Sequence, residues 1–457
     1  MNLNRLFSAM ALMVVMCGLA LIHVTSNRQS EIVAHSSHSQ VEDSAGDFEI
    51  RVNDDGNYAN RSQNFGELES SSTSRETMVL MNDPNINQNW GLAQTDAAKA
   101  WSVTQGSKKV VVAVIDTGID VNHPDIRANL WVNPDERRND KFGFRGDIHG
   151  WNFVDNNADL TDNHGHGTHI AGIIGAVGGN KIGITGIAPK VSLMILKYYD
   201  PKSTSNNNLK NTIRAFEYAI DMGADIINYS GGGLEKSPQE EAVIKKAKEK
   251  GILVVAAAGN ESSNSDVKGY YPADYDLDNI ISVTAIDRRK NVLSSSNFGV
   301  KTVDIAAPGN DIYSTLPRDK GGYGVMTGTS QATAFVSGVA ALIKANNADL
   351  RAPQIIKYLK HTGDVEPSLA SKTRYKRKIN TYRALTILDQ GMGVTGVRAE
   401  NTASMKSSQF SSERQVAETS VGNEGSISGF GSALLNHVQK TNSQKRIAEK
   451  PARAQGI

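Results

Sequence analysis

Short apolar runs and stretches of helical periodicity alternate along the middle of the chain. The run 110–115 (Val-Val-Val-Ala-Val-Ile) is apolar at every position and ends at Asp116, which predicts a strand buried on both faces. Apolar residues at positions 209, 213, 216 and 220 have the spacing of one helix face. The alternation continues with predicted strands at 226–227 and 252–256 and predicted helices at 239–250 and 333–345. This order predicts an α/β fold in which a parallel central sheet carries helices on both faces.

Both ends of the chain differ in composition from this middle part. Residues 1–26 combine Arg5 with an apolar run from Leu6 to Val24, which predicts a secretory signal peptide or, if the segment is retained, a signal anchor. Residues 27–81 are polar and lack periodicity, so we interpret them as a pro-segment or linker. Residues 391–457 are rich in Ser, Asn, Gln and Gly and predict a low-complexity, disordered tail. Residues 82–390 remain as one folded domain.

The net charge and the number of cysteines exclude some classes of protein. The chain has 49 Lys and Arg against 48 Asp and Glu, a net charge of +1, so it lacks the polycationic character of nucleic-acid-binding proteins. We therefore expect no nucleic-acid partner. The single cysteine, Cys17, excludes an intrachain disulfide framework. An exported protein without disulfides needs another source of stability, and a bound ion is a candidate.

Polar clusters stand where predicted strands end or where the buried helix begins. Asp116 ends the run 110–115, residues 162–172 hold three histidines among glycines, and Ser330 stands in a Gly-Thr-Ser sequence. In an open parallel sheet, ligands bind beyond the carboxyl ends of the strands, so we expect these clusters to lie together. Taken singly, Asp116 has a plain structural explanation as a turn or helix cap, and the Gly-Thr-Ser sequence has one as a helix cap. Three histidines among glycines are not expected in a plain solvated loop.

The histidines allow two interpretations. In the first, His164, His166 and His169 bind zinc in a His-x-His-x-x-His pattern, although the Asp that usually stands beside the last His is missing. In the second, one histidine is a general base between Ser330 and Asp116. The imidazole then takes the hydroxyl proton, and the carboxylate holds the imidazole in the required tautomer. The chain order Asp, His, Ser is one of the orders in which this triad occurs.

Taken together, the clusters resemble the three signature blocks of the subtilisin-like serine proteases, the subtilases. The blocks, in the family's order, are Asp116-Thr117-Gly118, His166-Gly167-Thr168-His169-Ile170-Ala171-Gly172 and Gly328-Thr329-Ser330-Gln331-Ala332. The resemblance covers most of residues 82–390. It implies the three-layer subtilisin-like fold and a serine endopeptidase that forms an acyl-enzyme with protein or peptide substrates. One departure is that the helix after Ser330 lacks the family's usual Pro and His and has Ala334 and Phe335 instead.

The resemblance also implies catalytic roles for matching residues. His166 is the base, Asp116 orients it and Ser330 is the nucleophile. Asn260 follows an apolar run in the way of the family's oxyanion-hole Asn, whose amide stabilises the charge that develops on the carbonyl oxygen. These four residues argue against the alternative function, a non-catalytic subtilase-fold scaffold that binds without turnover.

Further matches concern substrate and ion binding. The family's substrate-binding edge, which takes a peptide as an added strand, matches Ser230, Gly231 and Gly232. The pocket for the side chain before the scissile bond is then walled by small residues of this edge and of a second segment, Ala257, Ala258 and Gly259. We place Tyr270 at the pocket floor, where it makes the pocket shallower.

A calcium site is also implied by the resemblance. Asp125 and Asn180 match the family's high-affinity site, and their oxygens are the hard ligands that calcium takes. From the leader we expect a secreted or extracytoplasmic protein. We also expect a monomer, with membrane contact only if the leader remains as an anchor.

Overall fold

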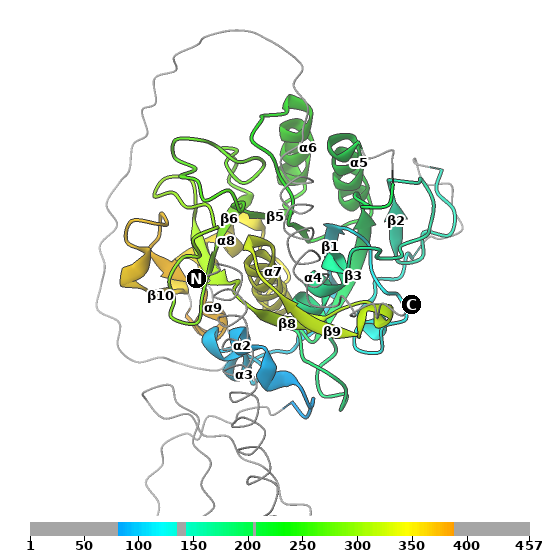
Figure 1. Cartoon of the computed structure of the whole chain (residues 1–457), viewed down its shortest axis with the longest axis horizontal. Coiled ribbons are helices and arrows are strands. Elements are labelled where there is room, and N and C mark those ends of the chain that lie inside the picture. The colour runs from blue at the N-terminus through cyan, green and yellow to red at the C-terminus, as the bar shows by residue number, and fades with distance from the viewer. Residues whose placement is uncertain (1–80, 135–142, 204–206, 388–457) are drawn as a thin grey trace, which may run out of the picture. The chain divides into compact units, whose positions relative to one another are not determined.

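The computed structural model describes residues 81–134, 143–203 and 207–387 (Figure 1). The predicted leader, nearly all of the predicted pro-segment and the predicted tail lie outside these residues, so those three predictions stay predictions. Among the described helices, none is both long enough and apolar enough to cross a membrane.

A nine-stranded sheet forms the centre of the fold, in the order β10-β11-β7-β6-β5-β4-β1-β3-β2. Every neighbouring pair in it is parallel except β10 and β11. Its strands are β1 (Gly106–Asp116), β2 (Gly150–Asn152), β3 (Lys190–Lys197), β4 (Ile226–Tyr229), β5 (Leu253–Ala257), β6 (Ile280–Ile286), β7 (Ile305–Pro308), β10 (Asp364–Val365) and β11 (Arg377–Lys378). A separate antiparallel hairpin consists of β8 (Ile312–Thr315) and β9 (Tyr323–Met326).

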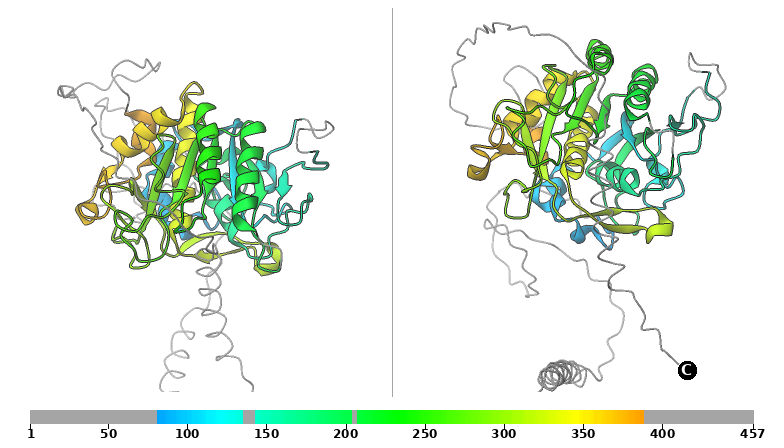
Figure 2. Two further views of the ribbon diagram at one scale, coloured as in Figure 1. Left: turned by 90° about the horizontal axis from the view of Figure 1, so that it is seen from above. Right: turned by 45° about the horizontal axis from the view of Figure 1, so that its top comes forward.

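Helices cover both faces of the sheet, as Figure 2 shows. The α-helices are α2 (Trp90–Gln94), α3 (Ala97–Ala100), α4 (His166–Gly175), α5 (Asn208–Asp221), α6 (Pro238–Glu249), α7 (Thr329–Asn346), α8 (Ala352–Thr362) and α9 (Thr381–Thr386). Short 3₁₀ turns stand at Ile86–Gln88, Arg127–Asn129, Arg318–Lys320 and Pro367–Leu369. The predicted fold class, a parallel sheet between two helical layers, is confirmed.

Alternation along β1 explains the two layers. Val112 and Val114 belong to the core beneath α4 and α7, whereas Ala113 and Ile115 belong to the core beneath α5 and α6. Because side chains of a strand point to opposite faces in turn, a strand buried on both sides has to be apolar at every position. The continuous apolar run of the sequence is therefore the signature of this central strand.

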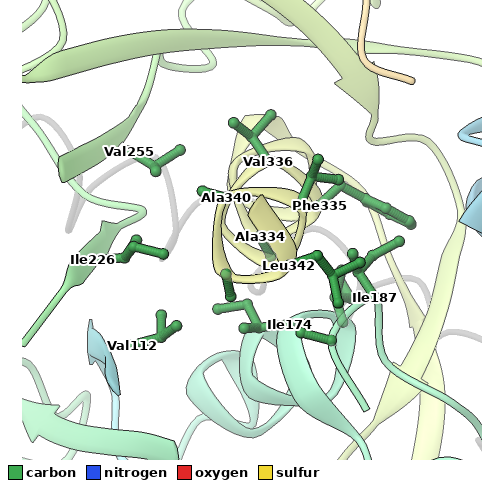
Figure 3. Close-up of a cluster of buried hydrophobic side chains, with 14 of the residues drawn as sticks. Val112, Ile174, Ile187, Ile226, Val255, Ala334, Phe335, Val336, Ala340 and Leu342 are labelled. Carbon is green, nitrogen blue, oxygen red and sulfur yellow. The ribbon is translucent and has the colours of Figure 1, made fainter. Parts of the chain in front are cut away.

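Helix α7 lies at the centre of one core and packs against β1, β4, β5, β6 and β7. Figure 3 shows its small and apolar side chains between the strands and α4. It begins four residues before the predicted start at 333, because its first turn is polar although it is buried. Phe335, which replaces the family's usual His, packs on α2. A Cβ placed on Gly91 would lie 2.2 Å from Cζ of that ring, so the contact requires glycine.

Candidate active site

Asp116 is the last residue of β1, and His166 is the first residue of α4. The Nδ1–H of His166 donates to Oδ1 of Asp116 over 2.7 Å, and both side chains are buried. Burial lowers the pKa of His166, but the charge and hydrogen bond of Asp116 outweigh it and raise the pKa above its ordinary value of 6.5. The hydrogen bond fixes the proton on Nδ1, which leaves Nε2 of the neutral imidazole as a proton acceptor.

Glycines allow the strand end and the helix start to approach so closely. A Cβ on Gly167 would lie 2.2 Å from the carbonyl oxygen of Gly118 and 3.2 Å from Cβ of Asp116. Gly118 has a φ of +109°, in the region that favours glycine. Gly118 and Gly167 therefore have a packing function, which is to bring Asp116 and His166 into contact.

Ser330 is the second residue of α7 and is 4% exposed. Its hydroxyl donates to the backbone carbonyl of Ser230 over 3.3 Å. Helix α7, which carries Ser330, packs against α4, which carries His166, but among the described residues no hydrogen bond joins the two side chains. In substrate-free enzymes such catalytic hydrogen bonds are often formed only when substrate binds.

Asn260 follows β5 and faces the start of α7. Its Oδ1 accepts hydrogen bonds from the backbone N–H of Thr329 over 3.0 Å and from the Thr329 hydroxyl over 3.3 Å. Its Nδ2 makes no hydrogen bond among the described residues. The N–H of Ser330 belongs to the first turn of α7, where amides have no partner within the helix. Nδ2 of Asn260 and the N–H of Ser330 are thus two donors at the start of α7 without a hydrogen-bond partner among the described residues.

The segment after β4 pairs with the backbone of Tyr271 and packs against tyrosine side chains. The N–H of Gly233 donates to the carbonyl of Tyr271 over 2.8 Å, and the N–H of Tyr271 donates back over 2.7 Å. A Cβ on Gly231 would lie 2.5 Å from the Tyr198 hydroxyl oxygen, and one on Gly232 would lie 2.4 Å from the Tyr270 ring. Both positions therefore require glycine.

The second predicted wall of the pocket lies on the other side of Tyr270. Ala257 ends β5, and Ala258 and Gly259 follow it, with Gly259 at a φ of +101°. A Cβ on Gly259 would lie 3.0 Å from Cδ2 of Tyr270. The Tyr270 ring, which is 2% exposed, therefore contacts both glycine segments.

The predicted calcium ligands also lie together. Nδ2 of Asn180 donates to Oδ1 of Asp125 over 2.8 Å, and the N–H of Ile184 donates to Oδ2 over 2.8 Å. The pKa of Asp125 is raised to about 6, mainly by burial and also by the nearby charge of Asp83, against the hydrogen bonds from Ile184 and Asn180, which lower it. Asp83 was missed by the sequence reasoning, because an isolated carboxylate far from Asp125 in the chain carries no signal of its own.

Asp83 holds the loop that carries Asn180. Its carboxylate accepts hydrogen bonds from the backbone N–H groups of residues 179, 180 and 181 over 2.8–3.2 Å, and from the Thr185 hydroxyl. Asp83 and Asp125 are both buried, and no Lys or Arg pairs with either of them among the described residues. Two buried carboxylates and a side-chain amide without a protein cation are the kind of donor set that fits calcium. The Asn180 amide would have to turn over to bind the ion, because its Nδ2 faces Asp125 and its Oδ1 accepts from the N–H of Ile182 over 2.8 Å.

The geometry does not support a zinc site formed by His164, His166 and His169. Nδ1 of His166 is bonded to Asp116, and Nε2–H of His169 donates to the Ile312 carbonyl over 3.0 Å, with the Gly324 carbonyl at 3.2 Å. Burial lowers the pKa of His169 to about 3. No group of three or more His, Cys, Asp or Glu side chains that is able to hold a metal occurs in the part of the chain that the structure describes.

Comparison with known proteins agrees with this arrangement. Residues 107–394 match the model of the Subtilase family. The chain is 36% identical over 300 residues to the thermophilic serine proteinase of Bacillus sp. (strain AK1), an alignment that covers 65% of this chain and 67% of that protein. It is 34% identical over 307 residues to thermitase of Thermoactinomyces vulgaris, covering 66% of this chain and 98% of thermitase.

The relatives differ in length and in setting. The chain is 36% identical over 261 residues to the major intracellular serine protease of Bacillus subtilis (strain 168), covering 56% of this chain and 74% of that protein. Other relatives are much longer, and the chain spans as little as 18% of their length. The family match, the parallel sheet and the relatives of similar sequence lead to one conclusion: the chain belongs to the subtilase family and is a serine protease.

Proposed function

We propose that this subtilase is a secreted endopeptidase that hydrolyses peptide bonds through Asp116, His166 and Ser330. The observation that carries the proposal is the buried 2.7 Å hydrogen bond between His166 and Asp116, made next to the helix on which Ser330 stands. A serine hydroxyl is a weak nucleophile until an imidazole takes its proton. The pair supplies an imidazole in the required tautomer together with the charge that stabilises its protonated form.

The reaction proceeds in two halves. Ser330 Oγ attacks the peptide carbonyl carbon while its proton passes to Nε2 of His166. The negative charge on the carbonyl oxygen is stabilised by Nδ2 of Asn260 and the N–H of Ser330. His166 then gives the proton to the departing amine, which leaves an acyl-enzyme. In the second half, water attacks the ester while His166 takes its proton, and His166 then returns the proton to Ser330 Oγ as the carboxylic acid product leaves.

Substrate binding uses the backbone of two segments. A peptide pairs as an added strand with the edge at Ser230, Gly231 and Gly232, because this edge carries no side chains that would block its hydrogen-bonding groups. The side chain before the scissile bond enters between this edge and the segment Ala257, Ala258 and Gly259, with the Tyr270 ring between the two segments. We expect the enzyme to act as a monomer on protein or peptide substrates. We expect no nucleic-acid partner.

Calcium is proposed as a structural ion. Asp125, Asn180 and Asp83 would hold it, since the donor set fits and the two carboxylates have no protein cation. When bound there, the ion would supply positive charge that offsets the burial of these carboxylates. Asp83 itself links the start of the domain to the loop 179–185.

The domain boundaries and the location follow from the sequence. Residues 1–26 are proposed to direct export and 27–81 to precede a peptidase domain at 82–390, with the low-complexity tail at 391–457. An extracytoplasmic location is supported by the basic start and apolar run of the leader. If the leader is retained, it anchors the enzyme to the membrane.

The activity is tested with a fluorophosphonate probe on purified wild type and on Ser330→Ala, followed by mass spectrometry of the labelled peptide. We expect label on Ser330 in the wild type and none at that position in the variant. Folded, processed wild type that takes no label would refute the proposal and favour the non-catalytic scaffold.

A further inference from the structure

Asp162 is a buried carboxylate that the proposed reaction does not use. It is 3% exposed and stands four residues before His166, in the turn that leads into α4. We propose that Asp162 is a positioning residue, which keeps Asp116 and His166 in hydrogen-bonding position and stabilises the protonated imidazole with its charge. This inference rests on the proposed function, because it assigns Asp162 to the same reaction.

Five hydrogen bonds converge on the Asp162 carboxylate. Its Oδ1 accepts from the Thr117 hydroxyl (2.8 Å) and from the backbone N–H groups of His164 (3.1 Å) and Gly165 (2.7 Å). Its Oδ2 accepts from the backbone N–H (2.9 Å) and hydroxyl (2.7 Å) of Thr168. The two carboxylate oxygens of Asp162 thus hold the backbone both before and after His166.

Thr117 connects this carboxylate to the end of β1. Its hydroxyl donates to Asp162 and accepts from the N–H of Gly167 over 2.9 Å, while its own N–H donates to Oδ1 of Asp116 over 2.8 Å. Asp116, Thr117 and Asp162 therefore form a continuous set of hydrogen bonds around His166. Rotation of α4 relative to β1 would break several of these bonds together.

The residue before Asp162 is anchored separately. Lys197, at the end of β3, is buried, and its Nζ donates to the Thr161 carbonyl over 2.6 Å and to Asp200 over 2.7 Å. Since β3 pairs with β1 at Lys197 and Asp116, the turn that carries Asp162 is tied to the strand next to Asp116. The carboxylate is thus held at a fixed place in the sheet.

The charge of Asp162 acts on His166 directly. Burial lowers the pKa of His166, and the charges of Asp116, from β1, and of Asp162, from the turn before α4, raise it. The other titratable neighbours are His164 in that turn and His169 on α4, and the pKa of each is lowered by burial first and by His166 second. No Lys or Arg pairs with Asp162 among the described residues, so its charge is compensated by N–H and O–H donors alone.

The test compares Asp162→Asn with a matched variant, Asp266→Asn. Asp266 is also a loop carboxylate that accepts backbone N–H groups, those of Val300, Lys301 and Thr302, and a threonine hydroxyl. Both variants remove one charge and disturb one loop, but only Asp162 adjoins His166. The His166 pKa and its Nδ1 proton signal are measured by NMR, and kcat and KM are measured with a peptide substrate.

For Asp162→Asn we expect the His166 pKa to fall by roughly half a unit or more, with a weakened Nδ1 proton signal. We also expect kcat to fall by roughly 10- to 100-fold at similar KM, because a small misplacement of a catalytic group costs about this much. Asp266→Asn should leave the His166 pKa, the Nδ1 proton signal, kcat and KM at their wild-type values. Equal changes in both variants, or an unchanged His166 signal in Asp162→Asn, would overturn the inference.

A second pair of variants keeps the test usable if Asp162→Asn does not fold. Thr117→Val removes the hydroxyl that connects Asp116 and Asp162, whereas Thr117→Ser keeps a hydroxyl at this position. Only the valine variant should therefore lose the Nδ1 proton signal. Loss in both, or in neither, would overturn the inference. The NMR readouts do not need turnover, so an enzyme that fluorophosphonate fails to label would refute the proposed function while the role of Asp162 is still decided.

Discussion

Asp116→Asn is the sharpest test of the charge relation at the centre of the site. The change keeps the size of the side chain but removes the negative charge that faces Nδ1 of His166 at 2.7 Å. The asparagine can also donate its N–H₂ to Nδ1, which would place the imidazole proton on Nε2, the wrong nitrogen for a base. We therefore expect a loss in kcat with little change in KM.

The size of the loss follows from the distance. Two unit charges 2.7 Å apart attract each other by about 6 kcal/mol at the effective dielectric constant of about 20 that suits protein sites. At a pH above the His166 pKa, the imidazolium forms only in the transition state and the intermediates, so there this attraction lowers the barrier and not the substrate affinity. Loss of this attraction is large enough to lower the rate by about 10,000-fold, a change that corresponds to about 5 kcal/mol. We therefore expect kcat to fall by roughly 10,000-fold.

The assay is steady-state hydrolysis of a peptide substrate, with fluorophosphonate labelling as a second measure of nucleophile activation. Ser330→Ala gives the background rate, and circular dichroism confirms that each variant is folded. We expect Asp116→Asn to lie close to this background and to label far more slowly than wild type. A folded Asp116→Asn that keeps kcat within about tenfold of wild type would refute the reasoning.

Three further predictions test other parts of the site. Because Asp116 raises the pKa of His166 and only the neutral imidazole accepts a proton, kcat/KM of wild type should fall on acidification with a midpoint above 6.5; a midpoint below it would contradict the pairing. Asn260→Ala should lower kcat by roughly 100- to 1,000-fold, the magnitude found for the oxyanion-hole Asn of subtilisin, whereas a change in KM alone would remove Asn260 from the oxyanion hole. A calcium chelator should lower the Tm of wild type by about 5 °C, as expected for loss of a ligand at about 100 times its Kd, and leave Asp125→Asn unaffected; an unchanged wild-type Tm speaks against the ion.

Much of the fold could be predicted from local pattern. The apolar run 110–115 lies inside β1, and the predicted helix 239–250 matches α6 to within one residue at either end. Ser237 marks the start of α6 by accepting the Glu240 N–H over 3.2 Å, and Pro238 follows at the first position, where its missing N–H costs nothing. These features succeed because they depend on neighbours in the sequence.

The parts that could not be predicted depend on contacts between distant segments. Asp83 and Asp125 show no shared pattern along the chain, and only the fold brings both of them to the loop of Asn180. Asp162 was visible only as one polar residue in a histidine-rich block, since its donors include Thr117, which is 45 residues away. Likewise, the sequence gives no sign that the Ser330 hydroxyl rests on the carbonyl of Ser230.

The central position of α7 has a consequence for when the enzyme becomes active. This helix packs against five strands, and Ser330 meets Ser230 across 100 residues of sequence. Contacts so distant in sequence form slowly, because the entropy of closing long loops is lost before the contacts repay it. A chain emerging from the ribosome exposes β1 and α4 long before α7 exists. Hydrolytic activity is therefore delayed until α7 has been synthesised and has packed against the sheet.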